Sequence, residues 1–468
     1  MTASSIQIDD GLDTLKDRFV PRYEVYVAKP VLSRDPPTPV TDLTPIDPDE
    51  ATADEQSRLD SNLFKETGAV GAPPPSISQL VPLAGPFGDK PDQHTDDILS
   101  VEFTESIEDG QLAKVTIEVL NVYDFVRQIY RYTDIPPNLS SDQSGSFPII
   151  DYGDTLALRF GYGTNVQWFF EGIVTTVEAS FPADGESLVT VTAVDKRDRM
   201  RGQKKVDVKA AANASVEQVI AQIAGLSGLR LAAPADQTTP SEASANRRPA
   251  DQDALQYITD RAKRGTLELL CFGDTLYALK PADAASEAIR YVYRAGLTSF
   301  KPTFNGVGTP TAVQLVYQDP DTNTAVNVTV TTQDLQDLGL IPRSSGDSAT
   351  DTVAKAGQAG DKTEVVTNYR ATSANEAKRL AAGILKRNID AIITAEGEVI
   401  GDPRIRPRVT LRIEGVGRYT GFYYVRSATH RLGPNGYQTT FTARRTTALA
   451  ADGSASAPDA GADQGSGG

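Results

Sequence analysis

Alternation of apolar and polar positions is the dominant pattern of this chain, and it predicts strands over most of its length. Near the N-terminus, Tyr23, Val25 and Val27 give one strand pattern within residues 18–32. Further patterns follow at 98–106, 112–121, 154–163, 166–182 and 186–195. Turn residues separate several of them, at Glu108–Gly110, Tyr162–Asn165 and Ala183–Glu186. Successive hairpins of this kind predict a half-buried antiparallel barrel within residues 96–206.

The period changes to that of helices in residues 207–300. Two helices are predicted, each opening with a capping box and closing at a glycine: Val216–Ala224 after Ser215, with Gln218, and Ala254–Arg264 after Asp253, with Gln256. A hairpin turning at Gly273–Asp274 follows, so this part is predicted to be a small α/β domain. A short helix followed by a loop is also expected at 121–148.

The last third of the chain returns to strands. Residues 311–332 have the pattern of a hairpin, and Ala374–Asn388 that of a helix, with Ser373 and Glu376 as a third capping box. Three strand patterns separated by Gly-rich turns then follow at Val409–Ile413, Gly421–Thr429 and Tyr437–Ala443. They predict a small antiparallel barrel or sandwich rather than a catalytic pocket.

Three segments lack a core-forming pattern. Residues 33–95 are rich in Pro, Asp and Thr and are expected to form an extended insertion, 333–363 a flexible insertion, and 451–468 a disordered tail. The predicted organisation is an N-terminal strand segment 1–32, the insertion 33–95, a first barrel 96–206, the small α/β domain 207–300, a second barrel 301–450 and the tail. The fold class is therefore mainly β with an α+β element: two antiparallel β-barrels joined by a small α/β domain.

Composition narrows the classes of function. The 468 residues carry a net charge of −16, from 46 Lys and Arg against 62 Asp and Glu. This excess of acid disfavours specific nucleic-acid binding and docking on anionic lipid. The N-terminus lacks the basic start and apolar run of a Sec signal, and no stretch approaches the roughly 20 apolar residues of a membrane span. We therefore expect a soluble chain made in a cytoplasm, with no membrane contact.

Candidate catalytic side chains are few. The two histidines, His94 and His430, belong to no metal-type spacing, and no G-x-S-x-G elbow is present. His94 is expected to lie in an exposed loop, and His430 to be a packing or hydrogen-bonding residue at a strand end. Cys271 lies in a mostly apolar run and is expected to be a buried small hydrophobe. We expect no catalytic, cofactor-binding or metal-binding residue, and hence no cofactor.

Charged clusters and glycine pairs have simple interpretations as well. Three carboxylate pairs could be cast as acid and base for glycoside hydrolysis: Asp195 with Asp198, Asp184 with Glu186, and Glu396 with Glu398. Nothing predicts that one member of a pair is desolvated, so solvated or turn-capping roles are favoured. The glycine pairs fit turns between strands: Gly161 with Gly163, Gly306 with Gly308, and Gly415 with Gly417. The basic run 196–205 could grip an acidic partner or form a solvated surface, and both alternatives stay open.

Four blocks of the chain, taken in order, resemble the hub proteins of contractile-tail baseplates. They are LRFGYGTNVQWFFEGIVTTVEASF continuing to Met200, ASVEQVIAQIAGLSGL, LQYITDRAKRGTLELLCFGDTLYAL, and the closing run RVTLRIEG, GVGRYTGFYYV, ATHRL and GYQTTFTARR. The resemblance covers roughly residues 96–300 and 370–446. The family includes late-control-protein-D-like hubs of phages and the hub part of type VI secretion spike proteins and of extracellular contractile injection systems.

The resemblance implies a non-enzymatic structural protein. It implies a homotrimer whose two similar barrels per subunit adapt a hexameric tail tube, or a tube-initiator protein, to a trimeric spike. The spike is expected to be a separate protein, and other baseplate proteins are expected partners. Assembly in the cytoplasm of a bacterial or archaeal host, followed by residence in the virion tail or injection particle, is implied as well.

Two alternatives come from other functional classes. A tail-associated peptidoglycan hydrolase would need a carboxylate whose loss abolishes cleavage of the cell wall. A carbohydrate-binding baseplate component would need clustered exposed aromatic residues, and Trp168, the single tryptophan, lies inside a strand-like run.

Overall fold

The structure of the protein is a computed structural model. It describes residues 7–10, 21–28, 81–82, 97–108, 110–125, 128–133, 150–162, 165–203, 215–233, 252–265, 267–281, 287–305, 310–318, 325–338, 362–367 and 374–446. His94, the tail 451–468 and almost all of the insertion 33–95 lie outside these ranges, and so do Ser373 and Gly306.

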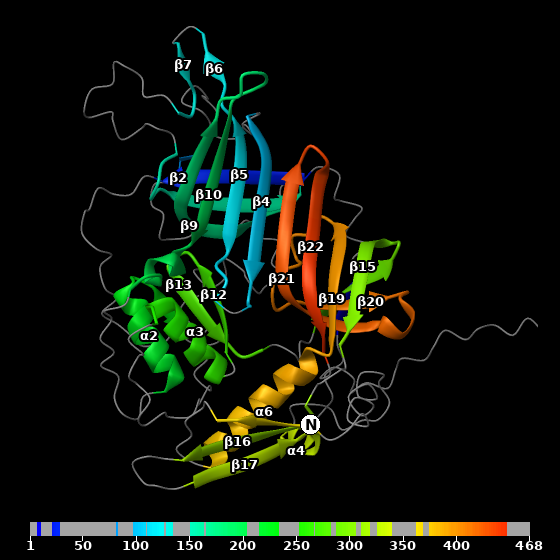
Figure 1. Cartoon of the computed structure of the whole chain (residues 1–468). Coiled ribbons are helices and arrows are strands. Elements are labelled where there is room, and N and C mark those ends of the chain that lie inside the picture. The colour runs from blue at the N-terminus through cyan, green and yellow to red at the C-terminus, as the bar shows by residue number, and fades with distance from the viewer. Residues whose placement is uncertain are drawn as a thin grey trace, which may run out of the picture.

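A single fourteen-stranded sheet runs through most of the described chain (Figure 1). Its strands, in the order in which they pair, are β1 (Gln7–Asp10), β14 (Glu287–Tyr293), β15 (Gly296–Phe304), β19 (Ile393–Ile400), β22 (Gly436–Arg445), β21 (Gly421–Gly433), β4 (Ile98–Ser106), β5 (Lys114–Leu120), β10 (Leu188–Asp195), β9 (Asn165–Ser180), β8 (Thr155–Tyr162), β2 (Pro21–Ala28) and β3 (Val81–Pro82), with β20 (Thr410–Glu414) off this path.

One end of this sheet closes on itself. β20 pairs with both β14 and β21, so β14, β15, β19, β22, β21 and β20 form a six-stranded ring, the closed barrel. Alternate residues of these strands fill it: in β19, for example, Ile393, Ala395 and Val399 are buried while Glu396 is exposed. The closing barrel predicted from the sequence is therefore present, and the mainly β fold class is confirmed.

The other half of the sheet is β4, β5, β10, β9, β8, β2 and β3, which we call the curved half. Five of its strands, β4, β5, β8, β9 and β10, were predicted for the first barrel, with alternating burial such as that of Val189, Val191 and Ala193 in β10. β2 belongs to the N-terminal strand segment, and β3 lies in the insertion 33–95, where no strand was predicted. The curved half is joined to the closed barrel by antiparallel pairing of β4 with β21, from Ser106 opposite Ser427 to Val101 opposite Leu432. The sequence predicted two antiparallel β-barrels joined by a small α/β domain, and the described strands of the two parts also pair directly into one continuous sheet.

A small α/β element packs below the curved half (Figure 1). It contains α2 (Val216–Leu226), α3 (Ala254–Arg264), β11 (Arg230–Ala232), β12 (Glu268–Phe272) and β13 (Thr275–Leu279), and the 3-10 turn η3 (Lys196–Met200) leads into it. Both predicted capping boxes are present. The side chains of Ser215 and Asp253 each accept from the backbone N–H of the glutamine three residues later, and the glutamine side chain accepts from the backbone N–H of the capping residue. These two helices and the hairpin at Gly273 were predicted correctly.

A second small sheet packs against a helix near the other end of the barrel. Its strands are β17 (Ala325–Thr331), β16 (Ala312–Gln318) and β18 (Thr363–Val366), with α6 (Ala374–Asp390) over one face and α4 (Thr332–Asp337) after β17. The hairpin and the long helix were predicted. The start of the segment 333–363 was expected to be irregular, but it belongs to α4, whose Leu335 is fully buried.

The prediction of a short helix after residue 121 was wrong. The chain forms a hairpin instead, with β6 (Tyr123–Asp124) paired to β7 (Ile129–Tyr130). Gln128 adopts a φ of 57°, a left-handed value that ends a helix and suits a tight turn. A short apolar run of this kind is compatible with either a helix or a strand. Packing of Tyr123 on Tyr130 across the hairpin stabilises the strand form.

The closed barrel requires a glycine at position 397. Gly397 lies opposite Phe441, and an added Cβ would lie 2.2 Å from the phenylalanine ring. We expect Gly397→Ala to lower the free energy of unfolding by about 1–3 kcal/mol, measured as a drop in melting temperature by circular dichroism. Gly433→Ala is the control, because its nearest contacts would be an ordinary 3.6 and 3.7 Å. Equal melting temperatures for the two variants would contradict this packing.

Candidate functional site

One short loop touches three parts of the fold. Residues 402–409, with the sequence DPRIRPRV, connect β19 to β20 and place arginines at positions 404, 406 and 408. Arg404 pairs with Asp402 of the same loop, Arg406 with Glu105 on β4, and Arg408 with Glu268 on β12. The loop therefore ties the closed barrel to the curved half and to the α/β element. We call this loop and its carboxylate partners the arginine junction.

The contact of Arg406 with Glu105 is the most deeply buried part of the junction. Nε and Nη2 of Arg406 donate to the two carboxylate oxygens of Glu105, each over 2.9 Å, and Nη2 also donates to the carbonyl of Phe169. The guanidinium lies 4.8 Å from the ring centre of Phe169. Burial raises the pKa of Glu105, and the charge of Arg406 opposes that shift. The bidentate geometry fixes both distance and orientation between the two halves of the sheet.

Arg408 makes the link to the α/β element. Its Nη1 donates to Oε2 of Glu268 over 2.5 Å, and the hydroxyl of Tyr424 donates to the same oxygen over 2.6 Å. Arg408 has a φ of 78°, a left-handed conformation that is uncommon for residues other than glycine. Such a backbone conformation persists where surrounding contacts determine it, and the shared Glu268 carboxylate is such a contact.

A second buried charge cluster lies where the curved half meets the α/β element. Nζ of Lys196 donates to Glu171 on β9 over 2.5 Å and to Asp274 in the β12–β13 turn over 2.8 Å. Burial lowers the pKa of Lys196, but the adjacent carboxylates outweigh it, so the net shift is upward and the group stays cationic. Beside it, Arg197 pairs with Asp195 over 2.7 Å.

This cluster corrects the interpretation of the basic run 196–205. The run was expected either to bind an acidic partner or to form a solvated surface. Neither alternative applies to its first two residues, Lys196 and Arg197. Lys196 and Arg197 are buried, because β10 ends there and the chain turns inward through η3. Arg199 and Arg201 do reach solvent. Asp195 caps η3 by accepting from the backbone of Arg197, as expected for the strand end.

His430 lies inside the protein, in β21 and three residues before that strand ends. It is fully buried, with its Nε2 2.9 Å from the carbonyl of Ile405 in the arginine junction. Because a carbonyl only accepts, Nε2 carries the proton and Nδ1 accepts from the hydroxyl of Tyr437 over 2.8 Å. Burial, and then the charge of Arg406, lower the pKa of His430 to about 3. A neutral, fully bonded imidazole of this kind has the structural role that was predicted.

The remaining sequence candidates do not converge on a site. Asp184 and Glu186 are exposed in the β9–β10 turn, and Glu396 and Glu398 lie on the outer face of β19. Burial raises the pKa of Cys271, which is buried as expected, and this suppresses its thiolate. Among the described residues, no three His, Cys, Asp or Glu side chains are grouped to hold a metal ion. Within the same residues, no helix is long and apolar enough to cross a membrane.

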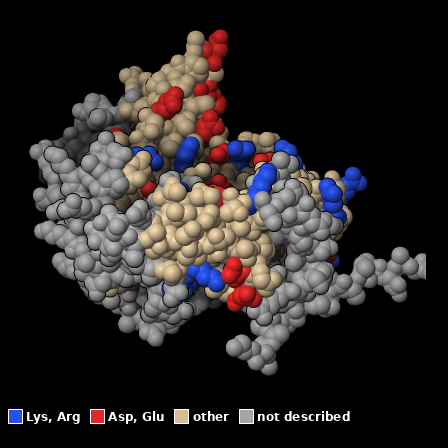
Figure 2. Space-filling view, turned by 60° about the horizontal axis from the view of Figure 1, so that its bottom comes forward, with Lys and Arg blue, Asp and Glu red and all other residues tan. Residues whose placement is uncertain are grey.

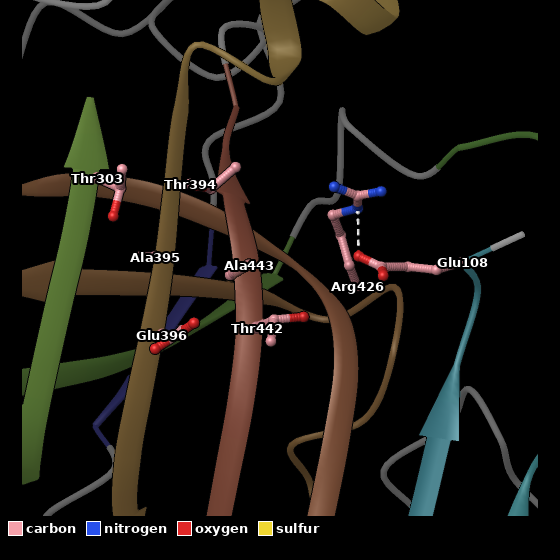
Figure 3. Close-up of a pocket in the computed structure, with 8 residues that line it drawn as sticks. All are labelled: Glu108, Thr303, Thr394, Ala395, Glu396, Arg426, Thr442 and Ala443. Carbon is pink, nitrogen blue, oxygen red and sulfur yellow. Dashed lines mark ion pairs between the residues drawn. The ribbon is translucent and has the colours of Figure 1, made fainter. Parts of the chain in front are cut away.

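A shallow polar hollow of about 220 Å³ lies on the outer face of the closed barrel (Figure 3). Its lining residues are Glu108, Thr303, Thr394, Ala395, Glu396, Arg426, Thr442 and Ala443. Arg426 is paired with Glu108 across its edge at 3.1 Å. The lining offers threonine hydroxyls, two carboxylates and the guanidinium of Arg426, and no histidine, cysteine or lysine.

Two solved structures share this fold. The 43 kDa tail protein of prophage MuSo2 from Shewanella oneidensis is 12% identical, with a TM-score of 0.53, and the match covers 75% of this chain and 95% of that one. The tail protein from Neisseria meningitidis MC58 is 11% identical, with a TM-score of 0.51, covering 75% and 94%. The chain therefore has the fold of phage tail proteins, as the resemblance to baseplate hubs implied.

The family follows from a second comparison. The family model described as the Alg8 N-terminal domain matches residues 142–433, which is more than half of the chain. The chain belongs to this family. No curated protein sequence matches it.

The arginine junction predicts a large effect of a single substitution. Arg406→Ala leaves Glu105 buried without its partner, and we expect a loss of about 3–5 kcal/mol in the free energy of unfolding. Arg431→Ala is the matched control, because Arg431 also joins the barrel to β4, through Glu102, but the two side chains are 61% and 39% exposed. Its loss is expected to be about 0–1 kcal/mol. Urea unfolding measures both, and similar losses would refute the special role of the junction.

The buried imidazole predicts a pH dependence of stability. The pKa of His430 is about 3 in the folded chain against an ordinary 6.5. Between these values the unfolded chain binds a proton that the folded chain does not, so stability is lost as the pH falls, by up to about 1.4 kcal/mol per pH unit. His430→Gln replaces the imidazole with a side chain that does not bind this proton in either state. The stability advantage of the wild type over the variant should shrink between about pH 6.5 and about pH 4 in urea melts, whereas a constant difference would argue against a neutral His430.

Proposed function

We propose that this chain is a structural hub in the baseplate of a contractile tail or injection machine. In this role three copies form an adaptor between a hexameric tail tube and a trimeric spike, without catalysing a reaction. The observation that carries the proposal is the pairing of β21 with β4, which makes the closed barrel and the curved half one continuous sheet. Three copies of such a double unit present six barrel-like faces, which is the number a sixfold tube requires.

The buried charge clusters support a load-bearing role. Force applied to the barrel passes to the curved half through the hydrogen-bonded β21–β4 ladder and through the contact of Arg406 with Glu105. It passes to the α/β element through Arg408 and Glu268. Because a buried ion pair cannot separate without leaving an unpaired charge, these contacts resist relative sliding of the three units.

The proposed partners follow from this role. They are two further copies of the chain, a tail-tube or tube-initiator protein, a separate spike protein and other baseplate proteins. Assembly is proposed in the cytoplasm of a bacterial or archaeal host, followed by residence in the virion tail or injection particle. Neighbouring copies can pair with strands that end the sheet, such as β1, which is the last strand at one end of the strand order. The alternatives weighed from the sequence, a peptidoglycan hydrolase and a carbohydrate-binding component, gain no support from the carboxylate pairs or from the buried Trp168.

The oligomeric state tests the proposal directly. Light scattering on the purified chain, alone and mixed with the tube and spike proteins encoded beside it, should give a particle of about three times the monomer mass of 50.1 kDa that binds both partners. Zymography on bacterial cell walls should give no cleared band. A chain that stays monomeric with both partners present, or that digests the wall, would overturn the proposal.

A further inference from the structure

Four aromatic side chains gather at the free end of the curved half. They are Tyr123 and Phe125 from the β6 end of the hairpin, Tyr130 from β7 and Phe181 from the turn after β9. We call them the aromatic tip. Neighbouring ring centres are 4.9–5.1 Å apart, yet Phe125 is 84% and Phe181 54% exposed. Phenylalanines so exposed, in one cluster built from two separate turns, are a feature of protein-binding surfaces.

The aromatic tip is held rigidly. The backbone N–H of Tyr132 donates to the side chain of Asn121, and its hydroxyl donates to Asp97 beside β4. The backbone N–H of Asn121 in turn donates to the carbonyl of Ser187 at the start of β10. The hairpin is therefore fastened to two strands of the sheet. Such pre-organisation lowers the entropy lost when the tip is bound.

Negative charge lies on the β9–β10 side of the aromatic tip, whereas Arg131 on the hairpin is paired with Asp97. Residues 176–186, which carry Phe181, include the exposed Glu178, Asp184 and Glu186 and no lysine or arginine. On the face drawn in Figure 2, Asp and Glu side chains lie along the upper projecting end, and Lys and Arg side chains gather below it. A partner that covers the rings must approach these carboxylates, so it is favoured when its own rim is basic.

We propose that the aromatic tip docks into an apolar socket, rimmed by Lys or Arg, on another protein. Phe125 and Phe181 enter the socket, and the carboxylates of the β9–β10 turn face its rim. The choice of a protein of the same particle as the partner rests on the proposed function, whereas the chemistry of the socket does not. This contact lies at the opposite end of the curved half from the α/β element (Figure 1), so it is separate from the arginine junction.

Two other occupants fit the tip less well. An anionic membrane surface would be repelled by the carboxylates of Glu178, Asp184 and Glu186. A sugar ring stacks on a flat aromatic platform, but successive rings of the tip are inclined by 83°, 63° and 69°. Edge-to-face packing of this kind makes a knob rather than a platform.

Photocrosslinking in the producing cells tests the contact. A photoreactive benzoyl-phenylalanine at position 125 should crosslink to one other protein, at residues that form an apolar pocket bordered by Lys or Arg. Adding Phe181→Ser should reduce the crosslink at least about tenfold. Phe304→Ser, which removes a phenylalanine of similar exposure, 48%, on the barrel, should leave it within about twofold. Because both side chains are exposed, melting temperatures of the variants should match the wild type.

The carboxylates of this chain that face the rim of the socket are tested separately. Asp184→Lys with Glu186→Lys should weaken the crosslink about tenfold and reduce its sensitivity to salt. The proposal is overturned by a crosslink unaffected by Phe181→Ser, by one to a second copy of this chain, or by one to a polar surface. It is also overturned if the purified chain binds phosphatidylglycerol vesicles or cell-wall glycan through Phe125 and Phe181. Mass spectrometry of purified particles tests the hub role independently. If the expected crosslink forms but the chain is absent from the particles, the hub role is refuted and the docking contact is not.

Discussion

The bidentate contact of Arg406 with Glu105 is the interaction on which the arrangement of this protein depends. Both side chains are withdrawn from water between the closed barrel and the curved half. Burying the two charges costs solvation free energy. Their mutual attraction offsets this cost only while the two side chains stay opposite each other. The contact therefore contributes less to overall stability than to specificity, since any shift of β21 along β4 would leave a buried charge without a partner. Neighbouring Arg408 extends the same constraint to the α/β element.

The uncharged imidazole of His430 completes this constraint from the barrel side. Its bond to the carbonyl of Ile405 holds the loop between Arg404 and Arg406 in place, and its ring packs on Phe103 and Phe169. A protonated imidazole would set a second positive charge beside Arg406, so the surroundings that suit Arg406 also keep His430 neutral. His430 thus acts as a hydrogen-bonding spacer in this barrel, and its low pKa is a consequence first of burial and then of the charge of Arg406.

Local signals in the sequence predicted most of the elements but not how they join. Alternation predicted most strands of the curved half, and β20, β21 and β22 of the closed barrel, but not its β14, β15 and β19. The boxes at Ser215 and Asp253 predicted α2 and α3, because a capping box depends on residues within a few positions. The β21–β4 pairing joins strands more than three hundred residues apart, and no local pattern specifies it. The basic run 196–205 was misinterpreted, because the sequence does not distinguish a buried lysine from a solvated one. Only the fold brings Glu171 and Asp274 to Lys196. One signal was available: DPRIRPRV carries three arginines and a single carboxylate, so two of the arginines can form ion pairs only with residues elsewhere in the chain.

Two local features of this protein depart from the usual distribution of side chains: several charged pairs are buried between its units, and one aromatic cluster is exposed at the free end of the curved half. These departures fit a part that must be stiff between its own units and adhesive toward another protein. A purely apolar contact between barrel and curved half would permit sliding, because the hydrophobic effect has no direction, whereas paired charges fix a register. At the aromatic tip the requirement is the opposite, since a contact formed during assembly must tolerate small errors of approach. Edge-to-face aromatic rings, held on the fastened hairpin and the turn beside it, meet that need, because their burial depends on area rather than on the alignment of single atoms.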